Sequence, residues 1–340
     1  MSGATRVLYI GGTGAISAAC VAESVRLGHE VTVLNRGRTA VRPLPPGVAT
    51  VTADVAEPGA LEAVLAGGFD VVVDFLCFTA EDAARAVAAC RGRARQYVFI
   101  SSASVYDRSR ARLPVVESTP RWRDPAGYTE AKMAAEDVFA AAYADGFPVT
   151  VVRPSHTYDD AKPPLPGGWT EVDRVLAGEE VVVPGDGTSL WTLTHASDFA
   201  VGLAGLLGDP RAVGETFHIT SAEVLPWDEV YRTLAELAGV QPRLVHVPAD
   251  LLAVAAPDWR WSALIAGDLR YSTVLDNGKI QRQVPAFRPV VTWAEGVRRL
   301  LAWREQHPAE CRRDPATDAV LGRLVTGVHR SADLLRSLVP

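Results

Sequence analysis

Two side chains four residues apart, Tyr128 and Lys132, form the pattern with the clearest chemistry in this sequence. The stretch from about Gly127 to Tyr143 is typical of a helix, where residues four apart share one face. An ammonium beside a phenol stabilises the phenolate, so the pair can take a proton from an alcohol or return one to a ketone. The same spacing is also common on helix surfaces without function, so other features must support it.

A serine-rich segment supplies that support. The run Gln96–Ile100 is typical of a β-strand, and Ser101–Tyr106 follows its end. In an open parallel sheet, ligands bind outside the carboxyl ends of the strands. We therefore expect Ser102 to hold a substrate oxygen while Tyr128 moves the proton. Ser104 and Tyr106 are candidates for substrate contacts.

A glycine turn near the start of the chain predicts a dinucleotide site. The β-forming run Arg6–Ile10 ends at a Gly-Gly-Thr-Gly turn, a helix is expected from Ala15 to about Leu27, and a second strand follows at Glu30–Leu34. In such a turn, glycines let the backbone approach a pyrophosphate and the first helical amides face its charge. Ser17 stands where a third glycine is usual, which is a mild departure. The predicted pyrophosphate contacts are Gly11, Gly12, Thr13, Gly14, Ala15 and Ile16.

The end of the second strand bears on which coenzyme is used. An acid there would bind the ribose 2′-hydroxyl of NAD, but this chain has Asn35, Arg36 and Arg38. Guanidinium groups fit a 2′-phosphate better than a diol, which favours NADP(H) and leaves NAD open. Asp54 follows the third strand as a candidate adenine contact. Cys77 follows the fourth strand and is expected near the nicotinamide, either as a contact or as a buried filler.

Together these motifs resemble an extended member of the short-chain dehydrogenase/reductase superfamily, in the NAD-dependent epimerase/dehydratase group. The resemblance covers about residues 6–305 and implies a Rossmann domain, a smaller C-terminal substrate domain and a homodimer. It also implies Ser102, Tyr128 and Lys132 as the catalytic set, and most often a nucleotide-activated sugar as substrate. Further matching segments are Arg153–Tyr158, Gly185–Gly187 and Thr194–Ala200.

Departures from that family narrow the chemistry. Sugar-nucleotide dehydratases carry an Asp-Glu pair after the active-site hydroxyl, whereas this chain has Ala103 and Ser104, so water elimination is not expected. His156 replaces a usual asparagine and can contact a phosphate, act as an acid/base group or serve structure alone. Trp191 replaces a basic residue that is frequent in sugar-nucleotide enzymes. Trp191 and Trp169 can stack on a substrate ring or pack in the core.

Three functions follow as hypotheses. The first is a redox-neutral epimerase of a nucleotide-linked sugar or polyol, which oxidises one hydroxyl carbon transiently. The second is an NADP(H)-dependent reductase or dehydrogenase of a ketone or alcohol, which the residues after the second strand favour. The third is a non-catalytic RNA-binding protein, because the chain also resembles the subgroup that includes chloroplast stem-loop RNA-binding proteins. The intact Ser-Tyr-Lys set argues against this third hypothesis.

Composition limits the partners. The chain has 340 residues, 48% of them hydrophobic, and a net charge of −6, which argues against a broad nucleic-acid surface. Four cysteines without Cys-x-x-Cys spacing fit a reduced, cytoplasmic setting. No metal-ligand spacing and no apolar run of membrane length is found. A local basic cluster can bind an anionic group or be solvated; it consists of Arg108, Arg110, Arg112, Arg121 and Arg123.

The order of predicted elements gives the fold class. Strands alternate with helices up to about residue 154, which predicts an α/β fold with a doubly wound parallel sheet. We expect a dinucleotide-binding domain at 1–160 plus about 190–222. A mostly helical substrate domain is expected at 161–189 and 223–310, and a helical extension at 311–340. The helix at about 315–338 is expected to pack on the substrate domain or on a partner subunit.

Overall fold

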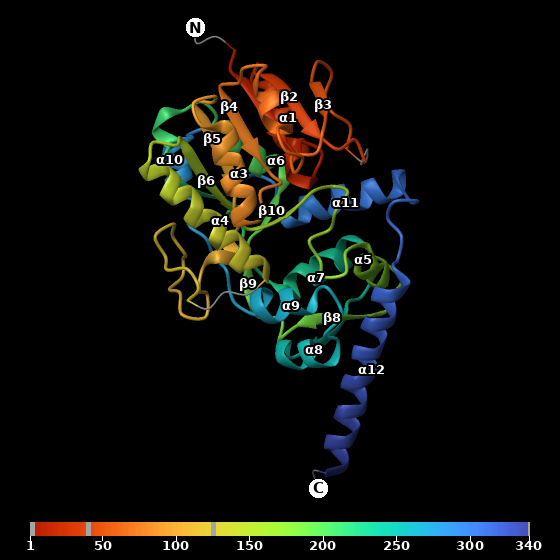
Figure 1. Cartoon of the computed structure of the whole chain (residues 1–340). Coiled ribbons are helices and arrows are strands. Elements are labelled where there is room, and N and C mark those ends of the chain that lie inside the picture. Colours follow the sequence, from red (N-terminus) through yellow and green to blue (C-terminus); the bar gives the residue numbers. More distant parts are fainter. Residues whose placement is uncertain (1–3, 39–41, 124–126, 339–340) are drawn as a thin grey trace. The chain divides into compact units, whose positions relative to one another are not determined.

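A computed structural model describes residues 4–38, 42–123 and 127–338 (Figure 1). It divides into two compact units. Unit 1 comprises Met1–Thr157, Thr194–Thr220 and Leu275–Val290, and unit 2 comprises Tyr158–Leu193, Ser221–Val274 and Val291–Pro340. The sequence grouped residues 275–290 with the substrate domain and set 311–340 apart, whereas the structure assigns the first segment to unit 1 and the second to unit 2.

Unit 1 is built on a seven-stranded sheet in the order β11-β6-β5-β4-β1-β2-β3. Every pair of neighbouring strands runs parallel. The predicted α/β fold with a doubly wound sheet is therefore confirmed. The strands are β1 (Arg6–Ile10), β2 (Glu30–Asn35), β3 (Ala49–Thr52), β4 (Val71–Asp74), β5 (Gln96–Ile100), β6 (Val149–Pro154) and β11 (Thr216–Ile219).

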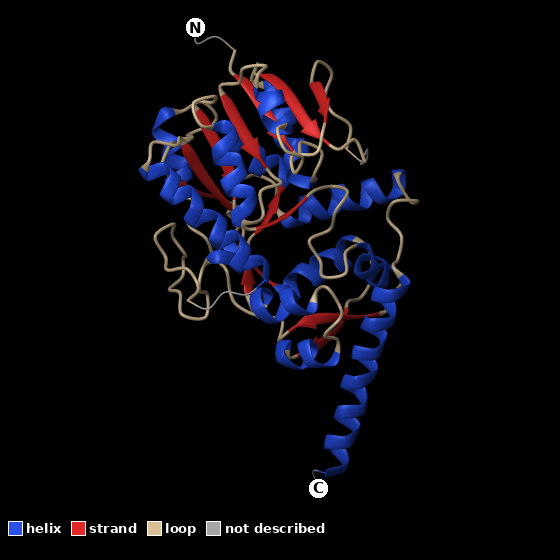
Figure 2. Ribbon diagram, in the orientation of Figure 1, coloured by secondary structure: helices blue, strands red, loops and turns tan. Residues whose placement is uncertain are grey.

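Helices cover both faces of this sheet (Figure 2). Successive side chains of a strand point to opposite faces, so Val7 and Tyr9 pack into one buried cluster while Leu8 and Ile10 pack into another. The first cluster includes residues of α1 (Ala15–Arg26), α6 (Ala196–Ala204) and α10 (Gly278–Gln283). The second includes residues of α2 (Ala60–Leu65), α3 (Ala80–Cys90) and α4 (Gly127–Ala144). Strands buried on both faces explain the continuous apolar runs in the sequence.

Residues 275–290 join unit 1 through contacts that are distant in sequence. Leu275 forms a β-bridge with Val115, and the Asn277 side chain donates a hydrogen bond to the Thr220 carbonyl at 2.8 Å. Ile280, Val284 and Phe287 then enter the apolar cluster beside α6. The short elements of unit 1 are η1 (Ala103–Val105) and η2 (Pro210–Ala212). The strands β7 (His156–Tyr158) and β10 (Leu193–His195) span positions where the chain passes from one unit to the other.

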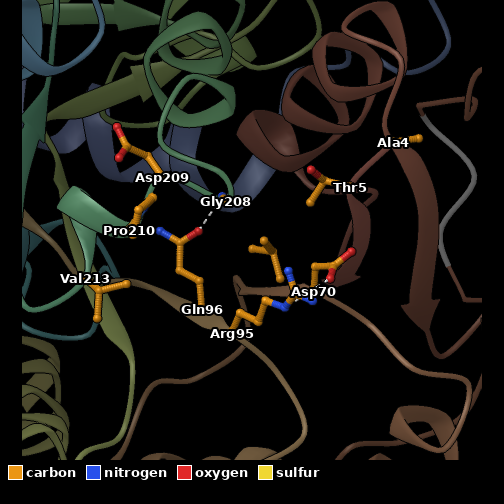
Figure 3. Close-up of a pocket in the computed structure, with 10 residues that line it drawn as sticks. Ala4, Thr5, Asp70, Arg95, Gln96, Gly208, Asp209, Pro210 and Val213 are labelled. Atoms are coloured by element: carbon orange, nitrogen blue, oxygen red, sulfur yellow. Dashed lines mark hydrogen bonds and ion pairs between the residues drawn. The ribbon is translucent and has the colours of Figure 1, made fainter. Parts of the chain in front are cut away.

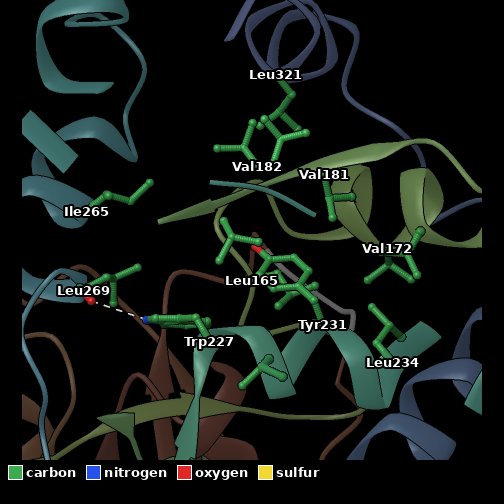
Figure 4. Close-up of a cluster of buried hydrophobic side chains, with 14 of the residues drawn as sticks. Leu165, Val172, Val181, Val182, Trp227, Tyr231, Leu234, Ile265, Leu269 and Leu321 are labelled. Carbon is green, nitrogen blue, oxygen red and sulfur yellow. Dashed lines mark hydrogen bonds between the residues drawn. The ribbon is translucent and has the colours of Figure 1, made fainter. Parts of the chain in front are cut away.

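Unit 2 has an apolar core rich in aromatic side chains, part of which is drawn in Figure 4. Trp227, Tyr231 and Trp293 are fully buried there. The strands are β8 (Glu180–Pro184), β9 (Leu190–Trp191), β12 (Leu225–Pro226) and β13 (Arg243–Val247). The helices are α5 (Trp169–Leu176), α7 (Trp227–Leu237), α8 (Ala249–Ala255), α9 (Ser262–Leu264), the π-helical η3 (Ile265–Leu269), α11 (Trp293–Gln306) and α12 (Pro315–Leu338).

Helix α12 packs on its own unit up to about His329, whose ring lies 3.0 Å from the Glu180 carboxylate of β8. Leu321, Leu324 and Val325 are buried in the core of unit 2, and Arg174 pairs with Asp318 at 2.7 Å. Toward its C-terminal end the helix exposes three leucines, Leu334, Leu335 and Leu338. The structure thus bears out packing on unit 2, one of the two expected positions for this helix.

Candidate active site

The glycine turn between β1 and α1 is fixed by close packing. Gly11 has a φ of +83°, and a Cβ there would lie 2.7 Å from Leu76 Cγ. A Cβ on Gly12 would lie 2.7 Å from Val33 Cγ2. Gly14 differs, because a Cβ there would meet only the Ser17 hydroxyl, at 3.1 Å. The exposed side of the turn is therefore at Gly14, where a ligand can approach the backbone.

Ser17, which stands where a third glycine is usual, holds this turn together through its hydroxyl. Its hydroxyl donates to the Gly11 carbonyl at 2.6 Å and accepts from the Gly14 amide at 2.8 Å. The side chain thus holds the turn closed across six residues. The first amides of α1, at Ala15 and Ile16, precede the intrahelical hydrogen-bond pattern and carry the positive end of the helix dipole. A pyrophosphate fits this arrangement of residues.

The end of β2 brings together two of the predicted coenzyme contacts. Arg36 Nη1 lies 3.8 Å from Asp54 Oδ2, and both side chains are exposed to solvent. Asn35 accepts a hydrogen bond from the Gly37 amide at 2.8 Å, which shapes the turn after the strand. Arg38 is exposed. This end of β2 therefore presents two guanidinium groups and an amide, and Asp54, which follows β3, is paired with Arg36.

Lys132 is almost completely buried on α4. Its ammonium donates to the Cys77 carbonyl at 2.7 Å and to the Ile100 carbonyl at 2.8 Å. Burial lowers the pKa of Lys132 from its ordinary value to about 8, although nearby acids, Asp74 and Asp82 among them, act in the opposite direction. The ammonium lies 5.9 Å from the centre of the Tyr128 ring. It can therefore act electrostatically on the phenol.

Cys77 contributes to the candidate site through its backbone carbonyl, which accepts from Lys132. Its side chain is buried, and burial raises the pKa of the thiol well above its ordinary value, so the thiol stays protonated and unreactive. Its carbonyl is positioned by Asp74, whose Oδ1 accepts from the Leu76 and Cys77 amides at 2.7 and 3.0 Å. Asp74 also accepts from the Tyr97 hydroxyl at 2.6 Å. Sequence analysis missed Asp74, although an acid at the end of a buried strand was a usable signal.

The serine segment leaves β5 and begins the short helix η1. Ser102 Oγ accepts from the Ser104 amide at 3.1 Å, and η1 contacts α4. Tyr128 lies in the first turn of α4 with about half of its surface exposed. Ser104 is buried, and among the described residues nothing lies within hydrogen-bond distance of its hydroxyl. Ser102 thus lies between β5 and η1, whereas Tyr128 and Lys132 lie on α4, and their catalytic roles stay a prediction.

A chain of buried polar groups runs behind these residues. Glu136 accepts from the Ser101 hydroxyl at 2.6 Å and from two nitrogens of Arg153 at 2.8 and 2.6 Å. Arg153 also donates to the Tyr106 hydroxyl at 2.7 Å, and that hydroxyl lies 2.6 Å from His218 Nε2. The predicted substrate contact at Tyr106 needs correction, because the side chain is fully buried and its hydroxyl is used inside the protein.

The protonation states of His218 and Tyr106 follow from their contacts. Burial lowers the pKa of His218 to about 4, so the ring is neutral near pH 7. His218 Nδ1 lies 3.2 Å from the Asp276 carbonyl, which only accepts, so Nδ1 carries the proton. Nε2 must then accept from Tyr106, whose pKa burial raises to about 12. The Tyr106 hydroxyl therefore donates to His218 and accepts from Arg153.

The remaining substrate candidates are placed differently from one another. Trp191 is buried, and its indole N–H donates to the Leu269 carbonyl at 3.2 Å, so it serves the core of unit 2 and does not offer a stacking face. Trp169 is partly buried and donates to the Ala161 carbonyl at 3.0 Å. His156 is half-buried in β7. Arg121 of the basic cluster binds Asp137 of α4 at 2.6 Å.

A pocket of about 480 Å³ lies at the opposite edge of the sheet, at the amino ends of β4 and β5 (Figure 3). Thr5, Asp70 and Arg95 are among its lining residues. The buried Gln96 amide there is bound to Thr150, Leu206 and Gly208. Within the described residues, no group of His, Cys, Asp and Glu is arranged to hold a metal. The helices of this same part of the chain include none long and apolar enough to cross a membrane.

A parallel sheet in this strand order, with a glycine turn after β1 and a Tyr-Lys pair on α4, defines a Rossmann-type enzyme of the short-chain dehydrogenase/reductase superfamily. The model of the NAD dependent epimerase/dehydratase family matches residues 7–220, and the chain belongs to this family.

Individual relatives cover most of the chain. The 2'-dehydrokanamycin reductase of Streptomyces kanamyceticus is 32% identical over 290 residues, which is 83% of this chain and 80% of the relative. Chloroplast stem-loop binding protein of 41 kDa b of Arabidopsis thaliana is 27% identical over 71% of this chain and 65% of its own length. Among solved structures, UDP-glucuronic acid 4-epimerase from Bacillus cereus, in complex with UDP-glucuronic acid and NAD, aligns with a TM-score of 0.68. It is 16% identical and covers 88% of this chain and 99% of its own, which shows a shared fold.

Proposed function

We propose that this enzyme is an NADP(H)-dependent reductase that interconverts a ketone and an alcohol on a sugar-like or polyol substrate. The carrying observation is the end of β2, which offers Arg36 and Arg38, with the nearby acid Asp54 paired with Arg36. Two guanidinium groups suit a 2′-phosphate, and an unpaired acid would repel it. Similarity to 2'-dehydrokanamycin reductase over most of the chain supports the same reading.

The residues present fit the coenzyme. The open side of the turn at Gly14 and the amides of Ala15 and Ile16 would hold the pyrophosphate, and Arg36 and Arg38 the 2′-phosphate. Gly11, Gly12 and Thr13 would shape that cradle, and Asn35 and Asp54 would contact the adenosine. The Cys77 carbonyl would act indirectly, by holding the Lys132 ammonium that donates to it. When bound, the nicotinamide supplies or accepts the hydride.

The protein's own residues handle the proton. In the reducing direction, Tyr128 donates its hydroxyl proton to the substrate oxygen, and Ser102 donates a hydrogen bond to the same oxygen. Lys132, held by two carbonyls, stabilises the phenolate left on Tyr128 by its positive charge. The unpaired Ser104 hydroxyl would bind a neighbouring polar group of the substrate. A buried hydroxyl without a partner costs free energy, which such a contact would offset.

A property of unit 2 favours a substrate without a diphosphate. Trp191 stands where sugar-nucleotide enzymes often carry a basic residue, and its ring is buried with its N–H bound to Leu269. That position can supply no positive charge to a diphosphate. A ketone on a sugar or aminosugar ring is therefore the better candidate, and a homodimer remains the expected assembly.

A redox-neutral epimerase of a nucleotide-linked sugar is the second candidate. The Ser-Tyr-Lys set serves both reactions equally, and the fold is shared with nucleotide-sugar epimerases. The two differ in what happens to the coenzyme. An epimerase returns the hydride to its own substrate and retains the coenzyme, whereas a reductase exchanges it in every cycle.

The first test identifies the coenzyme. Acid denaturation of the purified protein followed by mass spectrometry reports any retained nucleotide, and titration with NADPH and NADH reports exchange. We expect little retained nucleotide and tighter binding of NADPH. The double variant Arg36→Gln/Arg38→Gln should weaken NADPH binding about 10- to 100-fold, from the loss of about 1.5–3 kcal/mol of charged hydrogen bonds.

The control for this test is Arg312→Gln, which removes an exposed arginine of unit 2 and should leave coenzyme binding unchanged. Stoichiometric retained NAD would support the epimerase instead. Failure to bind either coenzyme, together with salt-sensitive RNA binding, would overturn both enzyme proposals.

A further inference from the structure

Glu136 lies four residues after Lys132 on α4, as Lys132 lies four after Tyr128, so the three side chains follow one helix face. Both Lys132 and Glu136 are buried. Each binds the end of β5: the Lys132 ammonium at the Ile100 carbonyl, and the Glu136 carboxylate at the Ser101 hydroxyl. Consecutive residues of the strand end, directly before Ser102, are thus held by consecutive turns of the catalytic helix.

The charge of Glu136 is balanced by one buried partner. Arg153 binds both carboxylate oxygens in a bidentate pair, and the side chains of both residues are less than 10% exposed. Arg121 approaches the same carboxylate at 3.3 Å, but its guanidinium also binds the exposed Asp137. Charges in such a dry environment act over longer distances than charges in water.

We propose that Glu136 is a positioning residue of the active site, which fixes the strand end at Ser102 against α4 and, balanced by Arg153, sets the protonation of Lys132. The proposal rests on Lys132 acting in the proposed reaction, but it concerns the chain's own residues and can be tested without coenzyme or substrate. Removing the acid Glu136 and removing the base Arg153 are expected to shift the pKa of Lys132 in opposite directions.

The surroundings of Lys132 define what else can move its protonation. Asp74 at the end of β4, Cys77 in the following loop, Asp82 of α3, and Tyr128 and Glu136 of α4 face the ammonium. Glu136 has a buried guanidinium, that of Arg153, as its direct partner. Its balance can therefore be changed in either direction by substituting one member of the pair.

The sequence makes the measurement simple, because the chain has three lysines, Lys132, Lys162 and Lys279. Protein labelled with ¹³C at lysine Cε gives one NMR signal for each, and Lys132→Arg assigns the relevant one. The pKa of Lys132 is read from a pH titration of that signal, while the other two lysines report that the protein stays folded.

We expect Glu136→Gln to lower the pKa of Lys132 by about one pH unit, because it removes a negative charge and leaves Arg153 unbalanced. Arg153→Gln should raise it, because Glu136 then keeps only the longer contact with the partly exposed Arg121. The double variant Glu136→Gln/Arg153→Gln removes both charges, is the variant most certain to fold, and should return the pKa close to that of the unsubstituted protein.

Asp137→Asn is the matched control, since it removes the adjacent carboxylate of the same helix, which faces solvent. It should leave the Lys132 signal unchanged. Shifts in the same direction for both single variants, or no shift in the double and single variants alike, would overturn the proposal. If the Lys132 pKa shifts as expected in these variants but the enzyme is inactive, that result would count against the proposed reaction alone.

Discussion

The two units handle buried polarity in different ways. Unit 1 buries a chain of charged and polar groups from Ser101 through Glu136 and Arg153 to His218, each with a partner from another element. Unit 2 buries mainly aromatic and aliphatic side chains, with the hydrogen-bonded pair of Glu171 and Tyr231 inside. Burial raises the pKa of Glu171 well above its ordinary value. The interior of unit 1 thus places a polar network behind the candidate site, whereas the interior of unit 2 mainly provides packing.

Among the variants predicted here, Tyr128→Phe in unit 1 is expected to have the largest effect on the rate. The substitution removes the hydroxyl that transfers the proton, so kcat should fall about 10²- to 10⁴-fold. The affinity for NADPH and the thermal midpoint should stay unchanged, because the side chain is half exposed. Steady-state kinetics with the ketone that the unsubstituted enzyme reduces fastest gives the measurement. Near-normal turnover would contradict the assigned role.

A second prediction separates packing from binding within the glycine turn. Gly12→Ala places a Cβ 2.7 Å from Val33 Cγ2 and should lower the free energy of unfolding by about 1–3 kcal/mol through overpacking. Gly14→Ala meets only the Ser17 hydroxyl and should keep most of that stability while weakening coenzyme binding. Urea unfolding and NADPH titration of both variants test this. Equal losses of stability would refute the distinction.

In unit 2, Trp191→Phe tests whether the tryptophan serves the core or the substrate. The Leu269 carbonyl loses one donor and the core loses part of a ring, so stability should fall by about 1–2 kcal/mol. The KM for the substrate should not change. Denaturation and steady-state kinetics of the same preparation decide the matter, and a raised KM at normal stability would restore Trp191 to the binding site.

The last prediction concerns pH. Burial lowers the pKa of Lys132 to about 8, so the ammonium is charged below that pH and is lost above it. The rate of ketone reduction should therefore decline above about pH 8, roughly tenfold for each further unit if the charge is required. Lys132→Arg keeps its charge to higher pH and should remove this limb from the profile. A limb that persists in that variant would have another origin.

Sequence analysis recovered the parts of unit 1 whose signals are local. The strand Arg6–Ile10, the turn after it and the helix carrying Tyr128 and Lys132 follow from residue types and spacing, and the structure has them at nearly the expected bounds. The strand Arg243–Val247 was not predicted, because it alternates exposed and buried residues only through its pairing with β8. The return of residues 275–290 to unit 1 likewise depends on contacts with Val115 and Thr220 that no local pattern reveals.

In the candidate site, too, residues with a local sequence signal were predicted, whereas residues defined by distant contacts were not. The candidate groups Ser102, Tyr128 and Lys132 are recognisable by their residue types and spacing, so they could be proposed from the sequence. Their supports, Asp74 and Glu136, are ordinary acids in the sequence and acquire a role only from their partners Tyr97 and Arg153. The role of Trp191, which the sequence left open between core and substrate, depended on a related point. A large aromatic ring suits both a core and a binding face, and only its burial distinguishes the two.

The three-part composition of unit 1 has a consequence for how the protein is made. During synthesis the first six strands of the sheet emerge early, but β11 and the segment Leu275–Val290 emerge only after long stretches of unit 2. Until then, the apolar side chains of β6 and α6 that these parts cover face the cellular environment. The nascent chain must therefore remain protected from aggregation until translation has passed Val290, and the ribosome completes the catalytic unit late.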